Sequence, residues 1–368
     1  MTIEVPFNPK RLKFARERRG WTKTRLAKEA GFSLRAINGF EGGDISPEAQ
    51  TVERLGSVLN FPTSFFYGDD IEQLNAEGVS FRSMAKMTAA QERAALGTGA
   101  LALSLNDWIE ERFMLPACRV PNLGGDTTPE AAANWIRQEW GLGEAPVTNM
   151  VHLLESRGVR VYSLAIDARE VDAFSFWRNE TPFIFLNTRK SAERSRYDAA
   201  HELGHLVMHK HASPHGQGAE LEANTFASAF LMPEHSVLAR APQLATVEGL
   251  KKLKKIWNVS IVALARRLHH LKVITDWHYH VLCREMSNLG YRSQEPDGSS
   301  RETSQVLGKV MAALRDDGLT RAKVAAELGV FPKEIDELVF GLALTGIPGS
   351  ARRPRGDGEK RPELKVIV

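Results

Sequence analysis

The chain has 368 residues, enough for two or three domains, and its 43% hydrophobic and 25% charged residues are ordinary for a globular protein. Only two cysteines, Cys118 and Cys283, are present, which excludes a disulfide framework and a cysteine-rich metal site. The sequence has neither a signal-peptide pattern nor a run of about 18 apolar residues, so we expect a cytoplasmic protein without a membrane span. The net charge of +3 is unevenly distributed, because residues 1–28 hold nine Lys or Arg against two Glu. Such a basic segment is typical of nucleic-acid binding, and equally of a solvated helix face.

Residues 8–66 show a pattern of short helices joined by tight turns. Thr22 and Ser33 are candidate helix N-caps, and Gly20, Gly31 and Gly43 stand at the predicted turns. Two helices joined by a short turn that contains glycine form the helix-turn-helix pattern. The alternative is a degenerate helical domain that serves protein contacts.

The spacing of these residues resembles the helix-turn-helix of phage repressors, the Cro/C1 or XRE type. The motif runs from Arg16 through Gly20, Thr22, Leu26, Ala30, Ser33, Ile37 and Glu41 to Pro47. The resemblance implies that the segment from Ser33 to Asn38 enters the major groove of double-stranded DNA. It further implies that Leu34 and Arg35 face bases, that Lys23 and Ser33 touch phosphate, and that Arg16 pairs with Glu41. Gly39 departs from the polar residue often found there, which weakens the expected base readout.

The next segment, residues 71–125, is predicted to be a linker and a long helix over about 88–115, with a boundary near 120 at Pro116, Pro121 and Gly124. Helices are predicted after Pro129 and over about 147–156. Three strand-like runs follow, Val159 to Leu164, Ala173 to Trp177 and Phe183 to Leu186. Phe183 to Asn187 could be an exposed edge that pairs with an extended substrate, or an ordinary inner strand.

His201-Glu202-Leu203-Gly204-His205 is an H-E-x-x-H motif within a helical pattern from Ser195 to His211. Histidines four residues apart share a helix face, so both can bind one zinc ion at about 2.0–2.1 Å. Glu202 lies about 100° further round the helix, where it can take a proton from the attacking water. Gly204 costs roughly 1 kcal/mol of helix propensity relative to Ala, which suggests the close approach of another element. The motif also occurs by chance in many proteins.

A second acidic helix, Glu220 to Pro233, follows at a suitable distance. Glu220 and Asn224 share one face, so we predict Glu220 as the third zinc ligand and Asn224 as the hydrogen-bond partner of a ligating imidazole. Glu222 is the rival ligand, although it points about 200° away from Glu220; both glutamates could also simply be solvated. The sequence does not choose the donor that stabilises the oxyanion. The candidates are Tyr197, His209, His211, His215 and His235.

Three runs in this region, Phe183 to Asn187, Asp198 to His209, and Glu220 to Pro233 with its Leu-Met-Pro end, resemble the ImmA/IrrE peptidase family. The resemblance covers roughly residues 80–290. It implies His201, His205 and Glu220 as zinc ligands and Glu202 as the base. Members of this family are bacterial or phage-borne, and they cut a helix-turn-helix repressor, often in response to stress.

The expected fold is mainly α with a small β-sheet (α+β). The predicted parts are an all-α helix-turn-helix domain (1–70), a linker and long helix (71–125), a zincin-like α+β peptidase domain (126–240), an all-α helix-turn-helix-like subdomain (241–290), an all-α C-terminal unit (300–345) and a disordered tail (346–368). The lysines at 251–255 could bind DNA, although a solvated face is the more ordinary reading.

We therefore expect a zinc-dependent endopeptidase that is fused to a DNA-binding domain. Its expected partners are double-stranded DNA and a protein substrate, a helix-turn-helix repressor whose cleavage derepresses stress, phage or mobile-element genes. A homodimer is one expected assembly state. The alternatives are a transcriptional regulator and an antitoxin, in which the peptidase fold would serve only protein binding.

Overall fold

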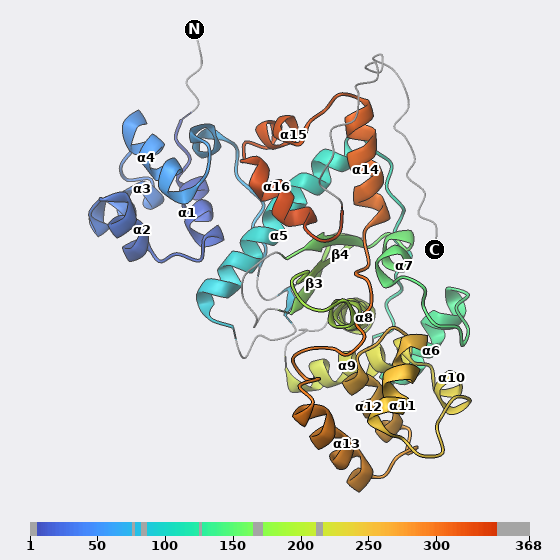
Figure 1. Ribbon diagram of the computed structural model, residues 1–368. Coiled ribbons are helices and arrows are strands. Elements are labelled where there is room, and N and C mark those ends of the chain that lie inside the picture. The colour runs from blue at the N-terminus through green and yellow to red at the C-terminus, as the bar shows by residue number, and fades with distance from the viewer. Residues whose placement is uncertain are drawn as a thin grey trace.

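The structure is a computed structural model that describes residues 6–75, 78–81, 87–124, 127–164, 172–210 and 216–343. The described residues are mostly helical with one small sheet, which confirms the predicted α+β class (Figure 1). The predicted disordered tail, 346–368, lies outside these ranges. In the described part of the chain, no helix combines the length and the apolar character needed to cross a bilayer.

The N-terminal lobe is a bundle of short helices around an apolar interior. Its elements are α1 (Pro9–Arg18), α2 (Lys23–Ala30), α3 (Leu34–Gly42), α4 (Ala49–Leu59) and the 3-10 turn η1 (Thr63–Tyr67). The side chains of Thr22 and Ser33 accept hydrogen bonds from the first turns of α2 and α3, as their positions in the sequence predict. Gly31 ends α2 with φ +73°, a conformation that costs glycine little. Local sequence therefore sets where these helices begin and end.

The sheet has four strands in the order β1-β3-β4-β2. They are β1 (Ser80–Phe81), β2 (Arg160–Ser163), β3 (Ala173–Arg178) and β4 (Thr181–Leu186). β4 pairs in parallel with β2 and antiparallel with β3, so the exposed edge predicted at Phe183 to Asn187 is wrong and the inner-strand alternative holds. The sequence also missed β1, since two residues are too few for an alternating pattern to register.

The sheet lies between two helices, α5 (Ala89–Glu110) and α8 (Ala192–Met208) (Figure 1). Side chains alternate along β3, so that Phe174 lies against α5 at Gly99, while Ser175 reaches α8. On its other side α5 contacts α1, where a Cβ at Gly97 would lie 3.1 Å from the Cα of Arg18. α5 ends at Glu110, short of the predicted Leu115, and the chain turns ahead of Pro116.

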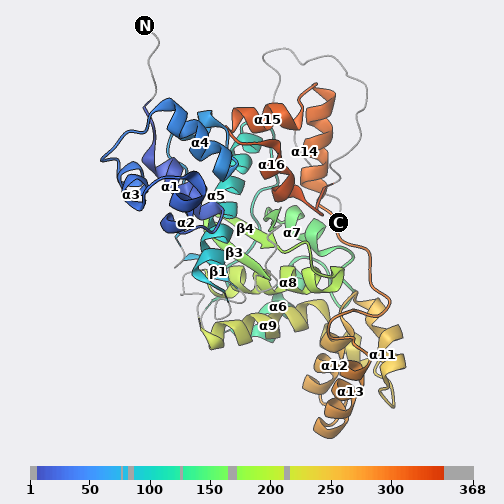
Figure 2. The same cartoon turned by 60° about the vertical axis from the view of Figure 1, so that its left-hand side comes forward.

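The remaining helices form the outer layers. They are α6 (Pro129–Glu139), α7 (Met150–Ser156), α9 (Gln217–Leu231), α10 (Glu234–Leu238), α11 (Val247–Leu253), the 3-10 turn η4 (Lys254–Ile256), α12 (Ile261–His270), α13 (Asp276–Asn288), α14 (Gln305–Asp316), α15 (Arg321–Glu327) and α16 (Pro332–Val339). α9 packs along α8, and α11–α13 form a separate lobe beyond it (Figure 2). α16 contacts β2 and α5, and its buried Glu334 lies 3.1 Å from Arg18 and 2.7 Å from Arg19. These ion pairs fasten the N-terminal lobe to the C-terminal helices.

Candidate metal centre

The H-E-x-x-H motif lies in α8, a helix that is buried along most of its length. Ser191 caps its N-terminus, and the side chains of His201, Glu202 and His205 are almost completely shielded from solvent. A Cβ at Gly204 would lie 3.1 Å from the Phe226 ring and 3.3 Å from the Cα of Ala223. The predicted close approach of another element at Gly204 is thus confirmed, and that element is α9.

This close packing brings α9 and its Glu220 to the two histidines. The Nε2 atoms of His201 and His205 are 3.1 Å apart. Glu220 Oε2 lies 3.5 Å from His201 Nε2, and Glu220 Oε1 lies 3.3 Å from His205 Nε2. Two ligand atoms bound at 2.0–2.1 Å to a tetrahedral zinc ion are separated by about 3.3 Å. The three donors therefore have the spacing that a tetrahedral zinc site needs.

Charge also suits a cation at this position. Burial opposes ionisation of Glu220, but its hydrogen bonds with His201 and His205 prevail and lower the pKa of this carboxyl to about 2. Glu220 is consequently a carboxylate at neutral pH. Two imidazoles and one carboxylate are a common donor set for zinc with an open fourth position.

Glu202 does not join the three donors, and a strand of the sheet fixes its side chain instead. The Ser175 hydroxyl on β3 donates a hydrogen bond of 2.6 Å to Glu202 Oε2. Both residues are buried, with Ser175 2% exposed and Glu202 0% exposed. Sequence reasoning missed Ser175, because a serine in a strand gives no signal that identifies its partner on a helix.

A second residue that sequence reasoning assigned differently is His209, one turn beyond His205. Its Nδ1 lies 3.0 Å from His205 Nδ1, and its Nε2 lies 2.8 Å from Glu222 Oε2. Glu222, the rival ligand, thus belongs to a chain of contacts behind His205 and not to the donor cluster. Histidine recurs at positions 201, 205 and 209, which share one helix face. This spacing was the sequence feature that could have identified His209 as the neighbour of His205.

Asn224 holds a different place from the one predicted. Its side-chain amide donates to the backbone carbonyl of Glu220 at 2.7 Å, within its own helix, while its backbone carbonyl accepts from the Tyr197 hydroxyl at 2.9 Å. Both residues therefore tie α8 to α9 beside the centre. Of the other candidate oxyanion donors, His235 is exposed on α10, and His211 and His215 lie outside the described residues.

The predicted DNA-binding residues lie together on the N-terminal lobe. Ser33, Leu34, Arg35 and Asn38 are exposed on one end of α3. The Ser33 hydroxyl accepts from Ala36 N as a helix cap, and Lys23 Nζ donates to Asn38 Oδ1 at 3.1 Å. Lys23 and Ser33 therefore already form hydrogen bonds within the protein. The phosphate contacts expected of them would be made in addition to these bonds.

Contacts of two buried residues, Arg16 and Gly39, surround α3 within the N-terminal lobe. Arg16 bonds Glu41 through two nitrogen–oxygen contacts of 2.6 and 3.0 Å, and both side chains are buried. Gly39 is buried as well, and a Cβ there would lie 2.6 Å from Ile45 Cδ1. A side chain at position 39 would therefore displace the flexible end of the Ile45 side chain.

Comparison with known families now adds to this geometry. Residues 154–269 match the IrrE N-terminal-like domain of the peptidase M78 family, and residues 10–64 match a helix-turn-helix domain. The chain joins an IrrE-like domain to a helix-turn-helix domain. No curated protein matches the chain. The IrrE-like match begins in α7 and ends in α12, so it includes the metal centre and part of the lobe beyond α9.

The two family matches indicate the general activities of the two domains. The helix-turn-helix domain supports DNA binding, and the IrrE-like domain indicates a metallopeptidase relationship and a metal cofactor. Within the described residues, His201, His205 and Glu220 form the group of donor atoms, all within 4.8 Å of one another, that could hold this metal.

Proposed function

We propose that this protein is a zinc-dependent endopeptidase whose helix-turn-helix domain brings it to DNA, and that its substrate is a helix-turn-helix transcriptional repressor. The observation that carries the proposal is the convergence of His201, His205 and Glu220 at zinc-compatible spacing, with the buried Glu202 one residue from His201. The IrrE-like and helix-turn-helix matches support the pairing of the two activities.

In this proposal His201, His205 and Glu220 hold the zinc ion. When bound, zinc polarises the scissile carbonyl and makes a water molecule more acidic. Glu202 takes the proton from the attacking water and passes it to the leaving amine. Ser175 keeps the Glu202 carboxylate aimed by bonding one of its oxygens, so the other oxygen serves the reaction.

The contacts behind the donors support the same assignment. His209 bonds His205 on the side opposite Glu220, and Glu222 in turn bonds His209. Outer partners of this kind fix the ring orientation and the tautomer of a ligating histidine. A site that served protein binding alone would not need this chain of polar contacts behind one histidine.

The test is co-expression of the full chain with the helix-turn-helix proteins encoded beside its gene, followed by metal analysis of the purified protein. We expect about one zinc per chain and cleavage of one such protein. Glu202→Gln should retain zinc and lower the cleavage rate by roughly 10²–10⁴-fold, because it removes the general base. Cleavage by Glu202→Gln at the wild-type rate would rule out this mechanism.

Control measurements separate the proposal from its rivals. His201→Ala should lose zinc as well as cleavage, whereas Glu202→Gln should bind promoter DNA like the wild type. Binding to promoter DNA without cleavage of any neighbouring helix-turn-helix protein would instead favour a transcriptional regulator. Tight binding to a neighbouring toxin, again without cleavage, would favour an antitoxin.

A further inference from the structure

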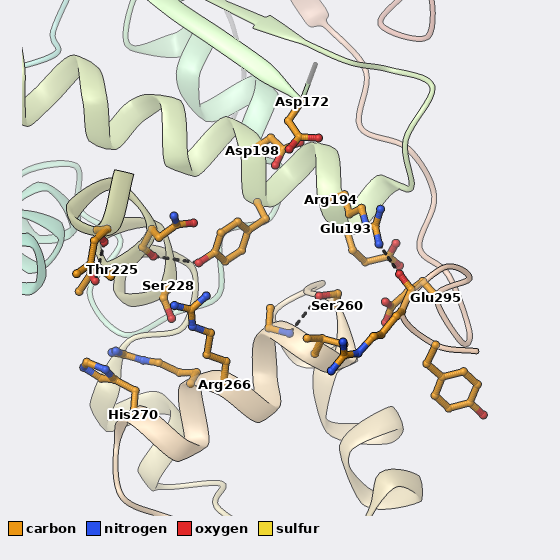
Figure 3. A pocket seen from close by; sticks show the side chains of 18 residues that line it. Asp172, Glu193, Arg194, Asp198, Thr225, Ser228, Ser260, Arg266, His270 and Glu295 are labelled. Atoms are coloured by element: carbon orange, nitrogen blue, oxygen red, sulfur yellow. Dashed lines mark hydrogen bonds between the residues drawn. The ribbon is translucent and has the colours of Figure 1, made fainter. Parts of the chain in front are cut away.

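A large pocket opens beside the metal centre, between the IrrE-like helices α8 and α9 and the helix α12 (Figure 3). Its volume is about 810 Å³, within the range of pockets that bury a ligand. Tyr197 and Asp198 line it from α8, and Asn224 and Ser228 line it from α9. None of these residues is a ligand of the proposed zinc, so metal binding does not account for the pocket.

The pocket continues the line of the metal centre along α8. Asp198 lies three residues before His201, hence about one helical turn or 5 Å along the axis. Asn224, which lines the pocket, donates to the backbone carbonyl of Glu220. Because an extended chain advances about 3.3 Å per residue, a peptide that crosses the metal centre reaches the pocket within two or three residues.

Four acidic side chains line the pocket. Asp198 is buried in α8, and the other three are engaged by groups outside the pocket. Asp172 forms an ion pair with Lys190. Glu295 lies 3.1 Å from Lys254 Nζ and accepts from Ile261 N at 2.8 Å, and Glu193 accepts from Ser299 N at 2.6 Å. These carboxylates therefore belong to the pocket wall and contribute little negative charge to its interior.

The arginines of the pocket, in contrast, form no direct ion pair with a carboxylate of the described residues. Arg267 is only 2% exposed, and its guanidinium donates through Nε to the Met232 carbonyl at 3.0 Å. Burial is the main influence on the pKa of Arg267 and lowers it. Arg266 is exposed on the same turn of α12 and extends toward Ser228 of α9 (Figure 3). Glu130 and Glu234 act on Arg267 only through longer-range attraction. A substrate carboxylate could therefore form the direct pair with its guanidinium that these two glutamates do not form.

We propose that this pocket is a specificity subsite that binds an acidic side chain of the peptide substrate. The substrate carboxylate pairs with the guanidinium groups of Arg266 and Arg267 and accepts a hydrogen bond from Ser228. A planar guanidinium matches a carboxylate with two parallel hydrogen bonds, which gives direction as well as charge. This inference rests on the proposed peptidase function, because it deepens the substrate class of that site.

The inference is tested with a library of random nine-residue peptides displayed on phage, panned on the zinc-loaded full chain that carries Glu202→Gln. Binding is read without cleavage in this background. We expect Asp or Glu to be enriched at one position of the bound peptides. The consensus peptide and its Asn or Gln counterpart are then synthesised, and their dissociation constants are measured by fluorescence anisotropy.

Charge reversal at Arg266 decides the assignment. Arg266→Glu should weaken binding of the acidic peptide by about tenfold or more, and a lysine at the same peptide position should restore part of the affinity. Arg284→Glu, the same change at an exposed arginine of α13 outside the pocket, should bind as before. Arg267→Gln is a second variant, used after its thermal melting shows an intact fold, since Arg267 also bonds the Met232 carbonyl.

Several results would overturn the subsite: no bound peptide, a consensus without an acidic residue, or equal losses in Arg266→Glu and Arg284→Glu. Failure of the peptidase proposal looks different. In that case the acidic peptide binds through Arg266, yet the chain with Glu202 intact never cuts it. If the intact chain cuts the peptide and Arg266→Glu binds it normally, the result supports the peptidase proposal and contradicts the subsite proposal.

Discussion

The proposed metal centre and the predicted DNA-binding surface place their polar side chains in opposite surroundings. His201, Glu202 and His205 are nearly inaccessible to solvent, and their positions come from the packing of α8 on α9 and the sheet. Ser33 and Arg35 are exposed on α3. Catalysis needs atoms held in place before the substrate arrives, whereas groove contacts can be completed by the DNA itself.

Each region nevertheless depends on one buried contact that is not part of its chemistry. In the N-terminal lobe this contact is the Arg16–Glu41 pair, which joins α1 to α3. In the IrrE-like domain it is Gly204, which lets α8 approach Phe226 of α9. If the two regions are independent, a substitution that damages one should leave the other intact.

The largest effect is expected from Arg16→Met. This change leaves the Glu41 carboxylate buried without its bidentate partner, which should destabilise the N-terminal lobe by about 3–5 kcal/mol. Hydrogen–deuterium exchange of residues 9–59 measures the loss, and zinc content measures the other region. Lys28→Met, at an exposed position of α2, is the matched control. A simultaneous loss of zinc would show that the two regions are coupled, for example through α1 and α5.

A smaller effect is expected in the IrrE-like domain from His209→Ala. The change removes the partner of His205 Nδ1 and leaves all three proposed ligands in place. Loss of such an outer partner lowers metal affinity by about 10–100-fold. Competition with a zinc chelator measures this affinity directly, without any substrate.

His235→Ala is the control for that experiment, because His235 is exposed on α10. It should leave both zinc affinity and promoter binding unchanged. Equal zinc affinity in His209→Ala and the wild type would mean that the contact behind His205 has no role in metal binding.

The two regions also differ in how much of them the sequence could predict. His201 and His205 could be named because helical periodicity sets which residues share a face. Glu202 followed from the H-E-x-x-H motif, and Glu220 from the acidic helix that follows and from the family resemblance. The caps at Thr22 and Ser33 could be named for a similar reason, since a cap is a local hydrogen bond. Wherever spacing along one helix decides the geometry, the sequence was sufficient for a specific prediction.

Contacts between elements were out of reach of such reasoning. Ser175 meets Glu202 only because β3 lies across α8, and β1 is too short to leave a pattern. Asn224 was assigned from helix spacing to an imidazole, yet it bonds the Glu220 carbonyl, because spacing gives a face and not a rotamer. The arginine-lined pocket depends on where α12 packs, which no local pattern encodes.

The smallest effect is expected from Lys23→Gln on the DNA-binding surface. Its ammonium group bonds Asn38 and lies 3.6 Å from Glu41 in the free protein, so a phosphate contact must compete with both. If Lys23 contacts one phosphate, the slope of log affinity against log salt should become shallower by about 0.9. Because phosphate contacts carry no sequence information, the loss should be equal on promoter DNA and on a random-sequence duplex.

Lys323→Gln, at an exposed position of α15, removes the same charge far along the chain and should leave the slope unchanged. A loss confined to promoter DNA, with an unaltered salt slope, would contradict the phosphate contact. It would mean that Lys23 acts by holding Asn38 in position for a base. The exposed surface would then be ordered in advance by an internal contact, as the buried centre is, and the contrast between the two regions would be one of solvent exposure alone.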